Sequence, residues 1–132
     1  MRADTRARVV PRLGAPRYRV DMFAVLYRWK LKPGTESTFR EAWRAVTETI
    51  KAERGGFGSR LHRTAEGELV AYAVWPSRER WEVAGTLPST NEGAAARMKA
   101  CIEQSMPSTP LDVIDDLIHD PRLDDDHTPD LP

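Results

Sequence analysis

The stretch that decides the fold is residues 69–81, LVAYAVWPSRERW. Its first seven residues are all apolar, whereas a strand with one face in water alternates apolar and polar residues. A Pro-Ser turn follows, and Ser77 starts a short helix that carries Trp81. We therefore expect a strand covered on both faces. In a chain of 132 residues, that requires the chain's own helices on one face and a second copy of the protein on the other.

The segments before this stretch predict a strand, a helix and a second strand. Residues 22–30 are rich in strand formers and run into a Lys-Pro-Gly turn. A helix from Thr35 or Ser37 to about Glu53 is indicated by one apolar stripe, and Gly55 is expected to end it. The stripe consists of Phe39, Ala42, Trp43, Val46 and Ile50. Residues 57–64 read as a strand that an Ala-Glu-Gly turn joins to residues 68–75, which makes a hairpin.

The segments after it predict two helical pieces and a final strand. A short helix covers residues 78–84, and a further helix begins at Thr90 or Asn91. Residues 106–110, which contain two prolines, are expected to end it. Its apolar stripe is Ala95, Met98, Cys101 and Ile102. Residues 111–119 mix apolar residues with Asp, as suits an edge strand. The resulting βαββαβ order is the ferredoxin-like arrangement of the α+β class, with a four-stranded antiparallel sheet.

The apolar content of the first and third strands predicts a homodimer. The helices of this fold cover one face of the sheet, and large contiguous apolar patches are rare on monomers. The residues in question are Phe23, Val25, Tyr27 and Trp29 on the first strand and Val70, Tyr72 and Val74 on the third. Burial of one large side chain contributes about 1.5–3 kcal/mol. We therefore expect a two-fold pairing of sheets that gives a dimeric α/β barrel.

Charge divides the chain into an arm, one domain and a tail. Residues 1–21 form a basic arm with six Arg against two Asp, residues 22–119 form the domain, and residues 120–132 form an acidic tail. The arm has one aromatic residue and no recognition helix, so we expect no nucleic-acid partner. No segment reads as a membrane span, so no membrane partner is expected. One cysteine, Cys101, fits the reducing cytoplasm.

Motifs for metal ions, phosphates and nucleophilic catalysis are missing from the sequence. His62, Cys101 and the carboxylates show no metal-ligand spacing. The Gly55-Gly56 pair follows a helix, whereas a phosphate-binding loop opens one. We therefore expect no metal ion and no bound cofactor.

The chain resembles the dimeric α/β barrel superfamily, and within it the antibiotic biosynthesis monooxygenase domains. The resemblance covers about residues 22–119 and rests on three segments: 22–34 (MFAVLYRWKLKPG), 39–43 (FREAW) and 72–81 (YAVWPSRERW). It implies homodimers with a pocket between each sheet and its helices. It also implies oxygenation of polycyclic phenols without metal or flavin, with the phenolate activating oxygen in a dry cavity that holds a base. A haem-degrading branch carries an Asn on its first strand and a His on its second helix, and this chain lacks both.

Three polar residues are candidates for catalysis. His62, the only histidine inside the core pattern, could deprotonate a phenol, or it could be a surface histidine of the second strand. Arg28 could pair with an anionic substrate oxygen, or it could be an exposed arginine near a strand end. Asn91 could bond a substrate, although helix capping also explains it.

Four aromatic residues are candidates for substrate binding. Trp81 follows the third strand at the mouth of a helix, where it could stack on a flat ligand. Tyr27, Tyr72 and Trp29 lie on the strands expected to be central, where they could orient a substrate or only pack. The first hypothesis is a cofactor-independent monooxygenase acting on an aromatic or quinol-like small molecule in an apolar pocket. The alternative is a non-catalytic, small-molecule-binding or stress-associated dimer.

Overall fold

The helices and strands of the computed structural model lie in one unit of the chain, Asp21–Val113. The structure describes residues 22–89 and 91–118, so the basic arm and the acidic tail lie outside the described residues. The elements are β1 (Phe23–Leu31), α1 (Glu36–Arg54), β2 (Gly58–Arg63), β3 (Leu69–Trp75), α2 (Arg78–Gly85), α3 (Glu92–Ala100), β4 (Ile102–Ser105) and β5 (Thr109–Asp112). Among the described residues, no helix has the length and apolar character that crossing a bilayer requires.

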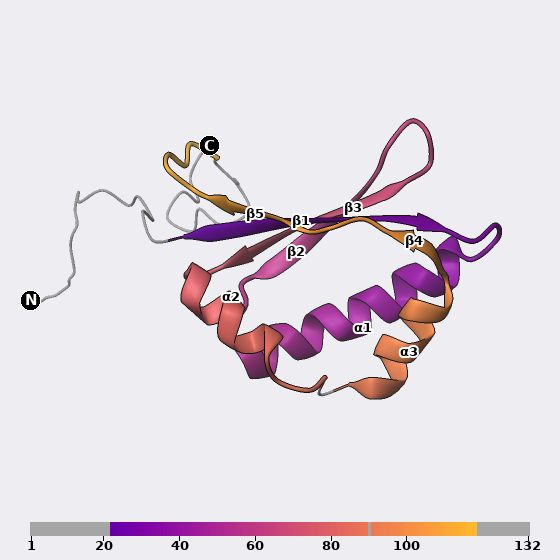
Figure 1. Cartoon of the computed structure of the whole chain (residues 1–132), viewed down its shortest axis with the longest axis horizontal. Coiled ribbons are helices and arrows are strands. Elements are labelled where there is room, and N and C mark those ends of the chain that lie inside the picture. The colour runs from indigo at the N-terminus through magenta and orange to yellow at the C-terminus, as the bar shows by residue number, and fades with distance from the viewer. Residues whose placement is uncertain (1–21, 90, 119–132) are drawn as a thin grey trace, which may run out of the picture. The chain divides into compact units, whose positions relative to one another are not determined.

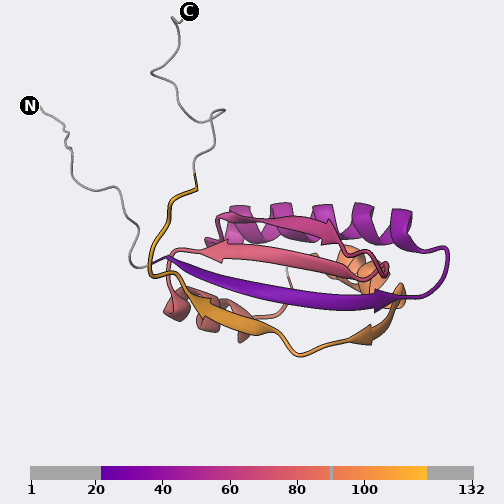
Figure 2. The ribbon, with the colours of Figure 1, turned by 90° about the horizontal axis from the view of Figure 1, so that it is seen from above.

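The strands form one antiparallel sheet in the order β2-β3-β1-β4, and β5 also pairs with β1. β1 and β3 are central and pair from Phe23 opposite Trp75 to Trp29 opposite Leu69. Figure 2 shows β5 and β4 one after the other along the same edge of β1. The ferredoxin-like α+β fold expected from the sequence is therefore confirmed, with its fourth strand position divided into two short strands.

The last strand differs from the sequence prediction, which places it at residues 111–119. The bounds of that prediction are wrong: β5 ends at Asp112, residues 113–118 form no strand, and β4 begins at Ile102, in the segment expected to be helical. Ile102 pairs with Leu31 across the sheet instead of continuing α3. The chain then stays beside β1, because the Met106 amide donates to the Arg28 carbonyl oxygen over 3.0 Å. Pro107, which has no amide proton, interrupts the ladder between β4 and β5.

The helix ends follow the capping residues that the sequence indicates. The Ser77 hydroxyl accepts from the Arg80 amide at 3.1 Å and begins α2. The Asn91 side chain accepts from the Ala94 amide at 3.2 Å and begins α3. Gly55 ends α1 with φ of 85°, a left-handed conformation that costs glycine little.

All three helices lie on one face of the sheet (Figure 1). Alternate residues of β1 point toward them, so Phe23, Val25 and Trp29 are buried in two core clusters. In the register, Leu26 lies opposite Tyr72 and Arg28 opposite Val70, on the other face of the sheet. We call this other face the open face.

This arrangement corrects the sequence prediction of which apolar residues lie on the sheet face that would pair with a second copy. The bulky residues of β1 pack under the helices, so they add nothing to the face that needs a partner. The apolar surface of the open face comes instead from Leu26 and from alternate residues of β3, which are half-buried. These β3 residues are Val70, Tyr72 and Val74.

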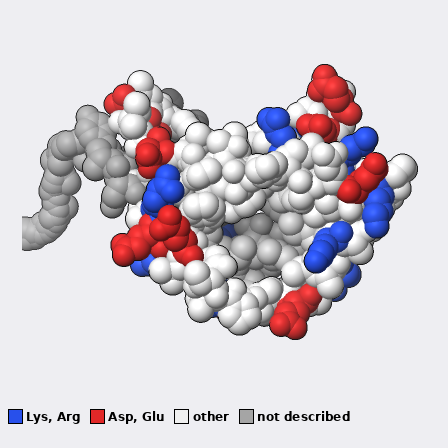
Figure 3. All heavy atoms as spheres, in the orientation of Figure 1, with Lys and Arg blue, Asp and Glu red and all other residues white. Residues whose placement is uncertain are grey.

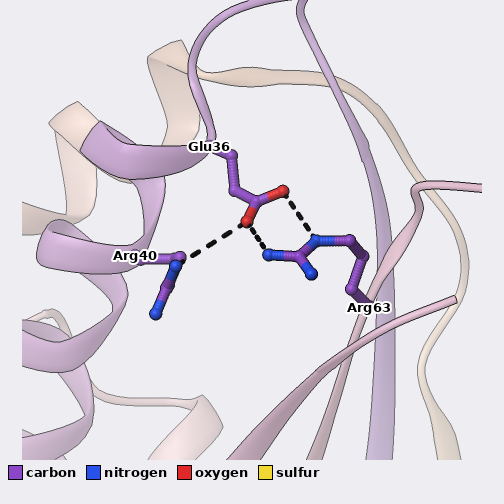
Figure 4. Close-up of polar contacts among 3 residues, drawn as sticks. All are labelled: Glu36, Arg40 and Arg63. Atoms are coloured by element: carbon purple, nitrogen blue, oxygen red, sulfur yellow. Dashed lines mark hydrogen bonds and ion pairs between the residues drawn. The ribbon is translucent and has the colours of Figure 1, made fainter.

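An ion pair links the start of α1 to the end of β2 (Figure 4). The Arg63 guanidinium donates to both carboxylate oxygens of Glu36, with Nε 3.1 Å from Oε1, and Arg40 lies 3.8 Å from the same carboxylate. The Arg63 hydrogen bonds hold the pKa of Glu36 below its usual value. Because these side chains are largely exposed, the pair contributes little to stability.

Candidate functional site

A cavity of about 250 Å³ lies between the sheet and the helices. Figure 3 shows the molecule hollowed beneath the sheet. The walls come from every layer of the fold. They include Tyr27 and Trp29 of β1, Trp43, Val46, Thr47 and Ile50 of α1, Ser59 of β2, Ala71, Ala73 and Trp75 of β3, and Met98 of α3.

The cavity exists because the sheet presents small side chains beneath its centre. Ser59 lies opposite Ala73 across the β2–β3 ladder, and Leu61 lies opposite Ala71. These residues share the helix-facing side of the two strands. Gly56 also lines the cavity, and a Cβ there would lie 3.3 Å from Ile50 Cγ2, a tight contact. The space beside Ser59, Ala71 and Ala73 is not filled by the large side chains of α1.

Tyr27 carries the best-defined polar group of the cavity wall. Its phenol oxygen accepts a hydrogen bond from Trp81 Nε1 at 3.0 Å. Burial raises the pKa of Tyr27, and the Trp81 hydrogen bond opposes that rise without cancelling it. The phenol therefore keeps its proton at neutral pH. While its oxygen accepts from Trp81, the phenol still carries one O–H donor.

Aromatic rings continue from this group in both directions. The Tyr27 ring stacks on Trp29 with centroids 6.0 Å apart and an interplanar angle of 7°. Trp29 in turn contacts Phe39 of α1, with a centroid distance of 5.1 Å. On the other side, Trp81 packs on Phe23, with centroids 5.5 Å apart. These contacts fix the Tyr27 ring in the wall, so its hydroxyl has a defined position.

The structure brings three of the predicted site residues together. Tyr27 and Trp29 line the cavity, and Trp81 holds the Tyr27 hydroxyl. Asn91 is at the start of α3, where its side-chain nitrogen also donates to the Thr49 hydroxyl over 3.4 Å. That contact joins α3 to α1 outside the cavity lining.

The other three predicted residues lie on the open face. Arg28 and His62 both pair with Val70 in the register, from the two sides of β3, and Tyr72 pairs with Leu26. His62 is exposed, and its Nδ1 donates to the Val70 carbonyl oxygen over 3.1 Å. The sequence could have indicated this separation, because Arg28 alternates with Tyr27 and Trp29 along one strand.

Two polar residues of the cavity, Ser59 and Trp75, are not assigned a role from the sequence. Ser59 Oγ and Trp75 Nε1 are both buried, and neither has a hydrogen-bond partner in the described part of the chain. Both residues line the cavity. The sequence feature that could have indicated them is the set of small residues on the helix-facing side of the β2–β3 hairpin, which predicts open space beside Trp75.

Charge is scarce around the cavity. Among the described residues that line it, Tyr27 is the one that titrates, and no carboxylate, histidine, lysine or arginine takes part. Within residues 22–89 and 91–118, no three His, Cys, Asp or Glu side chains gather as metal ligands would. The arrangement can therefore hold an apolar ring system and donate hydrogen bonds to it.

Comparison with known proteins identifies the family to which this sequence is similar. A family model described as antibiotic biosynthesis monooxygenase matches residues 22–88, which include β1 to α2 and the cavity walls other than Met98. A search of curated proteins gives no match.

Several solved structures share the fold. SnoaB from Streptomyces nogalater, a cofactor-independent oxygenase, is 17% identical with a TM-score of 0.62, over 75% of this chain and 99% of that chain. Rv0793 from Mycobacterium tuberculosis is 23% identical with a TM-score of 0.59, over 74% of this chain and 99% of that chain. A Caulobacter crescentus CB15 protein is 20% identical with a TM-score of 0.62, over 74% of this chain and 94% of that chain. At these identities, the likeness shows a shared fold.

Proposed function

The chain belongs to the antibiotic biosynthesis monooxygenase family, and from this premise we propose that it is a cofactor-independent monooxygenase of an aromatic or quinol-like small molecule. The observation that carries the proposal is the apolar cavity walled by Tyr27, Trp29 and Trp43. Family membership alone does not choose the reaction, because one fold hosts many chemistries. The similar fold of SnoaB, described as a cofactor-independent oxygenase, supports this choice.

The cavity limits the size and shape of the substrate. Its volume of about 250 Å³ is just below the roughly 300–1,000 Å³ typical of small-molecule sites. Its aromatic wall suits a flat ring system, since rings pack favourably in stacked or tilted pairs. We propose a substrate of about two fused rings that carries at least one oxygen.

The proposed reaction takes its electrons from the substrate. A phenol and O₂ give a quinone and water: one oxygen atom replaces hydrogen on the ring, and the other leaves as water. The phenolate form is the electron donor to O₂. Donation from the Tyr27 O–H to the substrate oxygen would favour that anion, and the substrate proton would pass to solvent, because the described cavity wall holds no base. Trp81 would act as a positioning residue, because it holds the Tyr27 hydroxyl.

We propose further that two copies pair through the open face. Leu26 and the apolar residues of β3 form a half-buried stripe on this face, and none of the helices covers it. Pairing would place Arg28, His62 and Tyr72 between two sheets, outside the cavity lining. The buried, free thiol of Cys101 is compatible with the proposed cytoplasmic location.

The second candidate function is a non-catalytic binder of an aromatic molecule. The observation in its favour is that Tyr27 is the one titratable group of the described cavity wall, so the protein supplies no general base there. Under this reading, the cavity binds the same class of ligand, and no oxygen is consumed.

The experiment is oxygen uptake by the purified protein with 1-naphthol, without added cofactor. Heat-denatured protein gives the autoxidation rate to be subtracted. We expect uptake of one O₂ per quinone formed and a fall of about tenfold or more in Tyr27→Phe. Tyr72→Phe makes the same change on the open face. A loss of oxygen uptake in Tyr72→Phe but not in Tyr27→Phe would place the site on the open face. No uptake above the rate of the heat-denatured control would favour the non-catalytic binder.

A further inference from the structure

The segment after β5 exposes apolar side chains to solvent. Ile114, Leu117 and Ile118 are 81%, 91% and 72% exposed, more than any other large apolar residue of the described chain. Single exposed apolar residues are ordinary on protein surfaces, whereas a contiguous group marks an interaction site. These three lie within five consecutive residues that form neither helix nor strand. They therefore indicate a segment that binds another surface.

The same five residues carry two carboxylates. Asp115 and Asp116 stand between Ile114 and Leu117 in the sequence. No ion pair formed within residues 22–89 and 91–118 includes either of them. A surface that fits residues 114–118 must therefore offer apolar area and positive charge together.

One end of the open face offers both. Arg28, Val70 and His62 lie side by side across β1, β3 and β2, and Arg60 lies on the same face two residues before His62. Val70 is half-buried, whereas Arg28, Arg60 and His62 are exposed. In the part of the chain that the structure describes, neither arginine takes part in an ion pair. We call these four residues the cationic end of the open face.

The start of the segment is fixed at the edge of the sheet. Leu111 of β5 pairs with Ala24 of β1, and the Val113 amide donates to the Met22 carbonyl oxygen over 3.4 Å. Because β1 begins at Phe23, the residues after Val113 have no strand of their own sheet to pair with. The segment is thus anchored at one end of the sheet and available to a partner beyond that point.

A second copy of the chain suits this segment better than its own sheet does. In the register, the row of Leu26 and Tyr72 lies between the Ala24 row, where the segment is anchored, and the Arg28 row. A segment that reached Arg28 of its own chain would cross Leu26 and Tyr72. Those apolar residues would then be unavailable for pairing with a second sheet.

We propose that residues 114–118 of each copy dock on the cationic end of a second copy, with their apolar side chains against Val70 and their carboxylates beside Arg28 and Arg60. This inference rests on the proposed pairing through the open face, and it adds the segment that joins the two copies. Because such pairing is two-fold, each copy gives one segment and receives one. Opposite charges select this arrangement over others, and burial of the apolar side chains supplies affinity.

The experiment exchanges charges between the two surfaces. The face variant is Arg28→Glu with Arg60→Glu, and the segment variant is Asp115→Arg with Asp116→Arg. Sedimentation equilibrium should show each variant alone dimerising at least about tenfold more weakly than wild type, because like charges then meet in both contacts. Native mass spectrometry, with one chain ¹⁵N-labelled, should show that a mixture of the two variants forms heterodimers with nearly wild-type affinity, since both contacts regain opposite charges.

Two controls separate this contact from other effects. The face variant mixed with wild type regains one contact of two, so its heterodimer should be weaker than that of the two variants. Leu117→Ser should weaken the wild-type dimer about tenfold through lost apolar burial. Leu87→Ser makes the same change at a residue that is 45% exposed between α2 and α3, and it should leave the dimer unchanged.

Three results would overturn the proposal. If the segment variant and Leu117→Ser dimerise like wild type, the copies pair without the segment. If the two weakened variants form no preferred heterodimer, the segment docks on its own chain. If the face variant pairs with wild type as tightly as with the segment variant, the charges act between the open faces alone. A monomeric wild type would refute the pairing together with this inference, whereas oxygen uptake tests the monooxygenase separately.

Discussion

Filling the cavity from the sheet should stabilise the fold and remove ligand binding. Ala73→Leu adds three carbon atoms on the helix-facing side of β3, in a residue that lines the cavity. At about 0.8 kcal/mol per buried CH₂, the added side chain would contribute up to about 2.4 kcal/mol. Ordering a leucine costs about 0.5–1 kcal/mol of that. Overpacking is the competing effect at a filled site, but about 250 Å³ is open here, so we expect a net gain of about 1.5 kcal/mol.

The assays are thermal unfolding and binding of 1-naphthol. A domain of this size should gain roughly 6–12 °C in Tm from that increment, while the affinity for 1-naphthol falls at least tenfold because the new side chain occupies the ligand's space. Ala96→Leu makes the same change at an exposed position of α3 and should alter neither property strongly. A folded Ala73→Leu protein that binds 1-naphthol as tightly as wild type would show that the ligand lies elsewhere.

Three further changes test individual contacts. Trp81→Phe removes the donor to Tyr27 and should cost about 1 kcal/mol in urea unfolding and reduce turnover, whereas unchanged turnover would contradict the positioning role. Ser59→Ala removes an unpaired buried hydroxyl and should raise the free energy of unfolding by about 1 kcal/mol, and a loss of stability would mean that the hydroxyl has a partner. Because Arg63 lowers the pKa of Glu36 in the folded state, their contribution is complete above the ordinary value of 4.5 and disappears as the pH falls below it. Acid titration of unfolding should therefore show wild type and Glu36→Gln converging in stability at low pH, and a constant difference down to that range would contradict the assignment.

The sequence predicts a helix correctly where its apolar periodicity and its capping residues agree. The α1 stripe ending at Gly55 and the caps at Ser77 and Asn91 all combine a pattern with a capping residue. The β4 segment has no such agreement. Ile102 continues the helical spacing of Met98, and only pairing with β1 makes it a strand. Tertiary pairing overrides local pattern in short edge strands.

The candidate site was predictable in part. Alternation along β1 places Tyr27 and Trp29 on one face, and the structure puts both in the cavity wall. The polar side chains of His62 and Arg28 made them candidates, but both residues lie on the sheet face away from the helices. Ser59 could not be predicted as a cavity residue, because a strand serine usually faces water and its burial depends on α1 covering β2.

The most direct test locates a bound phenol by nuclear Overhauser contacts to ¹³C-labelled methionine methyl groups. Met98 lines the cavity, whereas Met22 and Met106 lie outside its lining. We expect bound 1-naphthol to show contacts to the Met98 methyl group and none to the other two. Contacts to Met22 or Met106 without Met98, from a ligand shown to be bound, would contradict the cavity as the binding site.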